Sequence, residues 1–255
     1  MKPVRIAALV LAVGAVSAAC TSDRDDADRE LVVSAAASLT AAFTDIAADF
    51  EGATPGVRVS LSFGPSDGLA TQIVEGAPVD VFASASPRWM DVVAEDGPGV
   101  QGRADFARNL LAILVPAGEE GTVTGVEDLA EPGVRLVLAA EGVPAGDYAR
   151  EMLAKAGILE DVLANVVSNE EDVAAVVTKV ATGEADAGIA YVTDGLVAVD
   201  DVTTIPVPED VNVMSTYPIA VVGDSEEAEL AQRFVDFVLD EGQDVLASYG
   251  FERAA

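Results

Sequence analysis

Residues 31–40 read LVVSAAASLT and residues 57–70 read VRVSLSFGPSDGLA, and both stretches run from a predicted strand through a serine into a predicted helix. In the first, an apolar run ends near Ser38, and apolar residues then recur at helical spacing. In the second, apolar residues alternate up to a Gly-Pro turn, and Ser66 opens the next helix. A helix N-terminus offers unpaired backbone N–H groups and the positive end of a dipole. The two stretches therefore predict a cradle for an anion that needs no charged side chain.

Each of these serines also has a purely structural explanation. Serine is a favoured N-cap, because its oxygen accepts a hydrogen bond from a free N–H group of the first helical turn. Asp67 directly follows Ser66, and its carboxylate would either favour the helix dipole or accept a proton from an anion such as hydrogen phosphate. A single junction of this kind is weak support for a binding site, so the interpretation depends on what accompanies it.

The composition excludes several classes of function. The 255 residues, of which 51% are hydrophobic, can bury a large core in one or two domains. There is no histidine and only one cysteine, which removes Ser-His-Asp and Cys-His catalysis and the usual zinc and iron–sulfur sites. The formal net charge of −30 makes nucleic acid an unsuitable partner. Such an acidic protein must recognise an anion through local, oriented dipoles.

The N-terminus has the pattern of a bacterial lipoprotein signal. Basic residues precede an apolar run that is too short to span a bilayer, and small residues lead into Cys20. We expect residues 1–19 to be removed, Cys20 to carry lipid, and the polar residues 20–30 to form a flexible tether. The alternative is an ordinary secretory signal, because Ser17 stands where the lipoprotein motif more often has leucine. Both interpretations place the mature chain outside the cytoplasm.

After the tether, predicted strands alternate with predicted helices, so the expected fold class is α/β. The further strands are expected at 80–85, 109–116, 134–139, 187–192 and 217–222. Further helices are expected after an N-cap and proline at 86–87, at 145–156, after a capping box at 168–171, and at 226–239. Caps or bends follow several of these strands. In open α/β sheets, ligands bind at the carboxyl ends of the strands.

Several motifs resemble one protein family in their order and spacing. They are AAASLT at 35–40, SDGLATQI and GAPVDVFASA within 66–85, PRWMD at 87–91, VPAGDYA at 143–149 and GEADAGIAYVTD at 183–194. Together they resemble the molybdate-binding proteins of bacterial ABC importers, the ModA family. The resemblance implies a type II periplasmic-binding-protein fold, in which two lobes joined by two crossing strands close on a tetrahedral oxyanion. It places lobe I at 31–108 and 217–255, and lobe II at 109–216.

The same resemblance implies a set of ligand contacts that are all hydrogen-bond donors: the hydroxyl and N–H groups of Ser38 and Ser66, the N–H groups of Ala145 and Val173, and the hydroxyl of Tyr191. Molybdate and tungstate carry no proton at neutral pH, so donors alone satisfy every oxygen, whereas a protonated phosphate needs an acceptor. Selection against sulfate would depend on cavity size. The resemblance also implies a monomer without cofactor or catalysis that delivers its ligand to a permease, and the lipid predicted on Cys20 would anchor it to the cell membrane.

Two other functions stay open from the sequence. The same fold could bind sulfate or phosphate, whereas organic carboxylates are commonly clamped by arginine, which the junctions lack. An envelope hydrolase would need a metal or acid–base cluster, for which the candidates are Asp80, Asp91, Asp186 and Asp194. The same aspartates are more typical of the helix caps and solvated loops of a very acidic protein. Taken alone, Tyr191 reads as a core aromatic and Trp89 as a packing residue.

Overall fold

The computed structural model describes residues 29–118 and 123–254. The predicted signal peptide at 1–19, the predicted lipidation site Cys20 and the tether up to residue 28 lie outside the described residues. Among the residues that are described, no helix combines the length and the apolar character that crossing a membrane requires.

The first described strand begins earlier than the predicted tether allows. Arg29 and Glu30 already belong to strand β1 (Arg29–Ala36), which pairs in parallel with β2 (Val57–Gly64). The side chain of Arg29 also forms an ion pair with Glu227. Pairing of the backbone with β2 and this ion pair hold the two residues in the sheet, so the tether cannot extend to residue 30.

Strands and helices alternate along the chain, as predicted for the α/β class. The remaining strands are β3 (Val81–Ala83), β4 (Val100–Pro116), β5 (Leu136–Ala139), β6 (Val166–Glu170), β7 (Ala187–Tyr191), β8 (Val202–Pro206), β9 (Met214–Val222) and β10 (Glu252–Arg253). The α-helices are α1 (Thr40–Ala53), α2 (Ser66–Val74), α3 (Pro87–Asp96), α4 (Pro144–Ala156), α5 (Leu159–Leu163), α6 (Val173–Ala181), α7 (Val192–Val197), α8 (Ala228–Leu239) and α9 (Gly242–Ser248). Two short 3₁₀ turns are η1 (Ala37–Leu39) and η2 (Glu127–Ala130).

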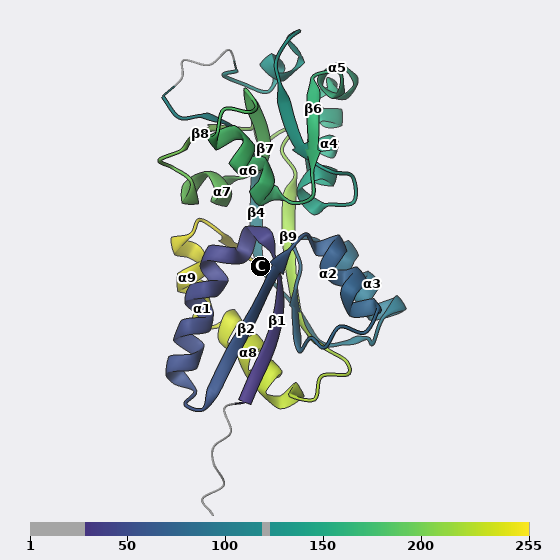
Figure 1. Ribbon diagram of the computed structural model, residues 1–255, viewed down its shortest axis with the longest axis vertical. Helices are drawn as coiled ribbons and strands as arrows, with labels where there is room; N and C mark the ends of the chain where they lie inside the picture. The colour runs from purple at the N-terminus through teal and green to yellow at the C-terminus, as the bar shows by residue number, and fades with distance from the viewer. Residues whose placement is uncertain (1–28, 119–122, 255) are drawn as a thin grey trace, which may run out of the picture.

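The strands form one continuous sheet in the order β2-β1-β3-β9-β4-β7-β5-β6, and β8 and β10 pair with β4. Strands β1, β2 and β3 run parallel to one another, as do β5, β6 and β7. Strand β4 is 17 residues long: its first part pairs with β9, and its last part pairs with β7 and β8. Strands β4 and β9 therefore pass through the waist of the molecule and join its two halves (Figure 1).

The hydrophobic core is divided at the same two strands. One cluster of buried side chains contains only residues from Leu111 to Val213. The other two clusters contain only residues from Leu31 to Ala107 and from Tyr217 to Phe251. We call the half around these two clusters lobe I and the half around the first cluster lobe II; lobe II is the upper half in Figure 1. Each lobe has its own packed interior, so the two can move relative to each other without exposing a core.

Helices cover both faces of the sheet in lobe I (Figure 1). Helices α1 and α8 pack on one face, where Phe43, Phe50 and Phe234 meet edge to face with ring centroids 5.2–6.3 Å apart. Helices α2 and α3 cover the other face, around Phe82. The spacing of the apolar residues on these helices places them on one side, and each large side chain that is fully buried stabilises the fold by about 1.5–3 kcal/mol.

One predicted helix start is confirmed and another is wrong. Ser86 caps α3 through a hydrogen bond from the N–H group of Arg88, 3.3 Å long, as predicted. The capping box predicted at 168–171 does not form, because these residues belong largely to strand β6, where the hydroxyl of Ser168 bonds to Glu170 instead. Helix α6 starts later and is capped by Asp172.

Candidate functional site

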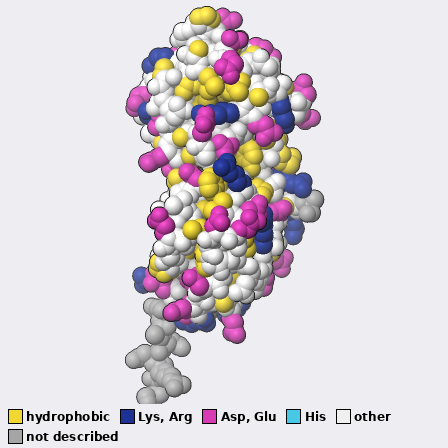
Figure 2. Space-filling view, turned by 90° about the vertical axis from the view of Figure 1, so that its right-hand side faces the viewer, with side chains coloured by type: hydrophobic (Ala, Val, Ile, Leu, Met, Phe, Trp, Pro, Cys, Tyr) yellow, Lys and Arg dark blue, Asp and Glu magenta, His cyan; other side chains and the backbone are white. Residues whose placement is uncertain are grey.

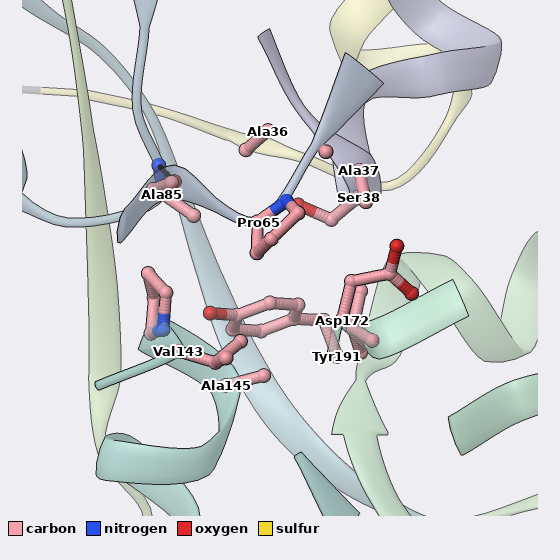
Figure 3. A pocket seen from close by; sticks show the side chains of 13 residues that line it. Ala36, Ala37, Ser38, Pro65, Ala85, Val143, Ala145, Asp172 and Tyr191 are labelled. Carbon is pink, nitrogen blue, oxygen red and sulfur yellow. Dashed lines mark hydrogen bonds between the residues drawn. The ribbon is translucent and has the colours of Figure 1, made fainter. Parts of the chain in front are cut away.

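A small pocket lies between the lobes, at the carboxyl ends of strands from both of them (Figure 3). It has about 20 Å³ of room for the centre of a water-sized sphere, little more than one water molecule needs. Lobe I contributes the ends of β1 and β2, and lobe II contributes the end of β7 and the first turns of α4 and α6. The structure brings together around this pocket all the residues predicted as contacts, namely Ser38, Ser66, Ala145, Val173 and Tyr191.

Ser38 lies at the first junction but does not cap a helix, contrary to the prediction. It is the middle residue of the 3₁₀ turn η1, and no side chain caps either η1 or the following helix α1. Its hydroxyl lies 3.0 Å from the hydroxyl of Tyr217 in strand β9.

Ser66 is the first residue of α2, and the N-cap position belongs to Pro65. The predicted cap is therefore displaced by one residue, because the extended backbone of the proline already ends the turn before the helix. The Ser66 side chain is 1% exposed, and its oxygen accepts a hydrogen bond of 3.0 Å from the N–H group of Ala85. The hydroxyl hydrogen of Ser66 is left for another partner.

Ala145 and Val173 lie in the first turns of α4 and α6, where backbone N–H groups have no partner within the helix. The start of α4 packs tightly against the end of β5: a Cβ atom at Gly146 would collide with the carbonyl oxygens of Ala139 and Ala140. The guanidinium group of Arg150 donates to the carbonyls of Ala139 and Gly146, both at 2.9 Å. These contacts fix the direction of the Ala145 N–H group.

Tyr191 ends strand β7 and is 1% exposed, yet its hydroxyl has no hydrogen-bond partner among the described residues. Figure 3 shows the hydroxyl directed into the pocket. Burial raises the pKa of Tyr191 well above its ordinary value, so the group stays a neutral O–H donor. An unpartnered buried donor costs about 1–3 kcal/mol, and an acceptor placed in the pocket would remove that cost.

The charges around the pocket are negative. Among the described residues that line it, Asp172 is the only charged one, and its carboxylate accepts a 2.8 Å hydrogen bond from the N–H group of Ala175. Sequence reasoning missed Asp172, although its place directly before an apolar helical stripe is typical of an N-cap. Asp67, the carboxylate suspected from the sequence, lies in the first turn of α2 outside the lining. On the face in Figure 2, acidic and basic side chains are mixed over both lobes.

The aspartates considered as a metal or acid–base cluster do not meet. Each is engaged locally: Asp80 with Val32 and Ser225, Asp91 with Arg103, Asp186 with Arg135, and Asp194 with the N–H group of Tyr191. No group of three or more cysteine, aspartate or glutamate side chains within 29–118 and 123–254 is arranged to hold a metal ion. This geometry gives no support to the hydrolase alternative.

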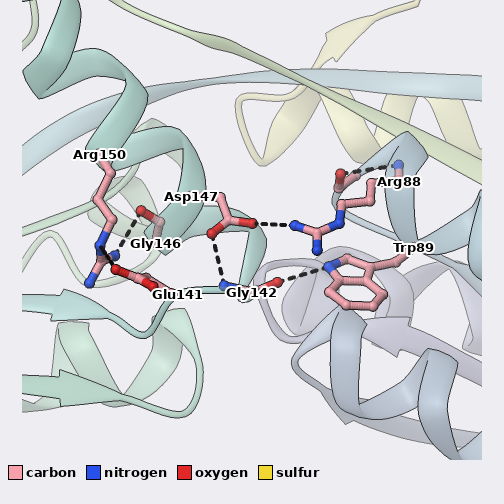
Figure 4. Close-up of polar contacts among 8 residues, drawn as sticks. Arg88, Trp89, Glu141, Gly142, Gly146, Asp147 and Arg150 are labelled. Carbon is pink, nitrogen blue, oxygen red and sulfur yellow. Dashed lines mark hydrogen bonds and ion pairs between the residues drawn. The ribbon is translucent and has the colours of Figure 1, made fainter.

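Contacts beside the pocket connect the two lobes directly (Figure 4). The indole N–H group of Trp89, in lobe I, donates to the carbonyl of Gly142, in lobe II, at 2.8 Å. Arg88 forms an ion pair of 3.1 Å with Asp147, whose other oxygen accepts the Gly142 N–H group at 2.8 Å. We call these four residues the interlobe clasp. Trp89 therefore does more than pack within lobe I, and the clasp ends at the turn that presents Ala145.

Comparison with known proteins identifies the family. The family model described as "Bacterial extracellular solute-binding protein" matches residues 31–252. The molybdate-binding protein ModA of Mycobacterium tuberculosis is 39% identical over 226 residues, which cover 88% of this chain and 85% of that protein. The chain belongs to the ModA family. Its members are extracytoplasmic solute-binding proteins and not enzymes.

Other similarities agree with this assignment. A putative ABC transporter substrate-binding lipoprotein of Bacillus subtilis, YvgL, is 30% identical over 92% of both chains. The periplasmic molybdate-binding protein of Azotobacter vinelandii has a TM-score of 0.79 at 22% identity, covering 88% of this chain and 100% of that one. The sulfate-binding protein SubI of M. tuberculosis has a TM-score of 0.81 at 17% identity, covering 89% and 87%. The two structures confirm the predicted two-lobed, type II fold.

The clasp generates a first prediction. Trp89→Phe removes the indole donor and keeps a ring, and Arg88→Gln removes an ion pair whose arginine side chain is 63% exposed. Because exposed ion pairs contribute only about 0–1 kcal/mol, we expect Trp89→Phe to have the larger effect. Both changes should increase the fraction of open molecules without ligand, measured by spin-label distances between Glu75→Cys and Glu160→Cys in a chain with Cys20→Ser. Arg103→Gln, which breaks an ion pair within lobe I, is the control. Unchanged distances in Trp89→Phe would contradict the role of the clasp.

A second prediction concerns Asp194, whose carboxylate accepts the Tyr191 N–H group. Burial raises its pKa from 3.8 to about 7, and the nearby Asp172 adds to the rise, whereas the Tyr191 hydrogen bond opposes it. The stability from the neutral carboxyl is thus fully present below about pH 4 and is lost as the pH rises through 7. Asp194→Asn keeps an acceptor but does not titrate. The difference between its melting temperature and that of the wild type should therefore rise by a few degrees in favour of the variant between pH 4 and 8. Exposed Asp200→Asn is the control, and parallel curves for Asp194→Asn and the wild type would refute the prediction.

Proposed function

We propose that this protein is the substrate-binding lipoprotein of an ABC importer, and that it captures molybdate, or tungstate, between its lobes and delivers it to a membrane permease. The observation that carries the proposal is the buried Tyr191 hydroxyl, which points into the pocket without a partner among the described residues. A tetrahedral oxyanion supplies the acceptor that this hydroxyl lacks. The relatives named as molybdate-binding proteins support this choice of ligand.

The proposed contacts are the residues predicted from the sequence. Ser38 and Ser66 donate from lobe I, and Ala145, Val173 and Tyr191 donate from lobe II. Hydrogen bonds to a charged acceptor contribute about 1.5–3 kcal/mol each, so several donors compensate for the absence of lysine and arginine among the residues that line the pocket. Because the donors come from both lobes, the ligand completes its shell only in the closed state, and binding is coupled to closure.

The negative charge of Asp172 opposes the binding of an anion in the pocket. A carboxylate beside a dianion weakens binding, but this one is the cap of α6, and the positive end of the helix dipole lies at the same place. The dipole of α6 and the N–H group of Val173 therefore act against the repulsion. Selection among oxyanions depends on this balance and on the size of the closed cavity, and sulfate is the competing ligand because SubI shares the fold.

The anchoring and the lobe boundaries belong to the same proposal. Residues 1–19 would be the signal peptide, Cys20 would carry the lipid, and the tether would end before Arg29. The lipoprotein named among the relatives supports the anchor. Lobe I would comprise 31–108 and 217–255 and lobe II 109–216, which the division of the core at β4 and β9 supports. We propose that the protein works as a monomer, because one chain supplies the whole pocket.

Isothermal titration with molybdate, tungstate, sulfate and phosphate under one set of conditions tests the proposal. We expect molybdate and tungstate to bind tightly, one per chain, and sulfate to bind far more weakly. Binding of only sulfate or phosphate would leave the assignment of the fold intact but would refute molybdate as the ligand. No heat with any of the four anions would overturn the proposed function.

Single substitutions test the contacts. Ser38→Ala and Ser66→Ala each remove one donor to a charged ligand, and each should weaken molybdate binding by about 1.5–3 kcal/mol, roughly 10- to 150-fold. Tyr191→Phe should weaken it as well and should stabilise the unliganded protein, because it removes an unpartnered buried hydroxyl. Titration and thermal unfolding of each variant measure these effects. The exposed Ser248→Ala is the matched control, and affinities equal to the wild type in both serine variants would refute the assigned site.

A further inference from the structure

Tyr217 lies outside the residues that line the pocket, yet its hydroxyl is 3.0 Å from the hydroxyl of Ser38. It belongs to β9, one of the two strands that join the lobes, and it is fully buried. Its ring is held edge to face by Phe106, Tyr191 and Phe251, with centroids 5.5–6.3 Å away. The ring therefore has little freedom, and the position of its hydroxyl is fixed.

The direction of the Tyr217–Ser38 hydrogen bond decides what Ser38 can offer to a ligand. Each hydroxyl has one hydrogen, so Ser38 can donate into the pocket only if Tyr217 donates to Ser38. A phenol is a stronger donor than an aliphatic alcohol and a weaker acceptor, because its ring withdraws electron density from the oxygen. Burial raises the pKa of Tyr217 above its ordinary value, so its proton is retained. These properties favour Tyr217 as the donor of this bond, which leaves the hydrogen of Ser38 free.

Ser66 shows the same arrangement with no ambiguity. Its oxygen accepts from the backbone N–H group of Ala85, which can only donate. At both serines, a donor of the protein occupies the oxygen and leaves the hydrogen for the pocket. The carboxylate of Asp172 is engaged with the first turn of its own helix, and in Figure 3 it points away from the Tyr191 hydroxyl. At Ser38, Ser66 and Tyr191, the pocket therefore presents donors to its occupant.

We propose that Tyr217 is a positioning residue that fixes Ser38 as a hydrogen-bond donor and thereby selects oxyanions that carry no proton. The inference rests on the proposed function, because it assigns a cause for the selectivity of that same site. Sulfate and hydrogen phosphate are similar in size and charge at about pH 8 but differ by one proton. In the wild type, the phosphate hydroxyl meets another donor at Ser38. Without Tyr217, Ser38 can turn and accept it.

Tyr217→Phe keeps the ring and removes the hydroxyl, so it tests the proposal. We expect molybdate binding to weaken about five- to tenfold, the loss that one neutral hydrogen bond produces. In a Ser38→Ala background, the same change should alter the dissociation constant less than about twofold, because Tyr217 acts through Ser38. Competition against molybdate at about pH 8 gives the affinities for sulfate and hydrogen phosphate, and their ratio should shift towards phosphate by about fivefold or more in Tyr217→Phe.

The controls separate this role from a structural one. Tyr249→Phe removes a hydroxyl that bonds to Asp45 at the surface and should leave every affinity unchanged. Thermal unfolding without ligand shows whether Tyr217→Phe folds, and if it does not, Ser38→Ala, which removes the positioned donor, should by itself shift the sulfate-to-phosphate ratio towards phosphate. An equal loss of affinity in both backgrounds, or an unchanged ratio of the sulfate and phosphate affinities, would overturn the inference about Tyr217. Molybdate binding by the wild type would still support the proposed function in that case. Absence of oxyanion binding by the wild type would overturn both.

Discussion

Unpaired hydrogen-bond donors that converge from two separate lobes are the constraint on which the structure depends. The first turns of α4 and α6 and the ends of β1 and β2 each present polar groups at one place, and no lysine or arginine is among the described residues that line it. Since each donor is weak alone, the site works only if all of them are aimed by rigid neighbours. Gly146 permits the close approach of α4 to β5, and Arg150 holds that approach in place.

The strands that join the lobes also contact the donors of the pocket. Strand β9 carries Tyr217 between the lobes, where it bonds to Ser38 and packs on Tyr191, so the crossing strand touches donors from both sides. The interlobe clasp adds contacts outside the pocket that also form between the lobes. On the proposed function, protein contacts of modest strength favour closure, and the ligand would supply the larger part of the stabilisation through charge-assisted hydrogen bonds.

The sequence predicted the alternation of strands and helices and the junctions that meet at the pocket, because apolar periodicity and turn residues are local signals. It misplaced the caps at Ser38 and Ser66, since a 3₁₀ turn and an extended proline differ from a helix start by only one residue. The capping box at 168–171 failed because pairing with β5 outweighed local propensity. Contacts such as that of Trp89 with Gly142 join segments far apart in the chain, and no local pattern reports them.

A crystal structure of the protein with molybdate would test the proposed site between the lobes, because the anomalous scattering of molybdenum locates the anion without reference to the side chains. We expect one site per chain between closed lobes, with the oxygens of the anion within hydrogen-bond distance of the donors of Ser38, Ser66, Ala145, Val173 and Tyr191. An anion bound elsewhere, or bound between the lobes through a lysine or arginine side chain, would contradict it.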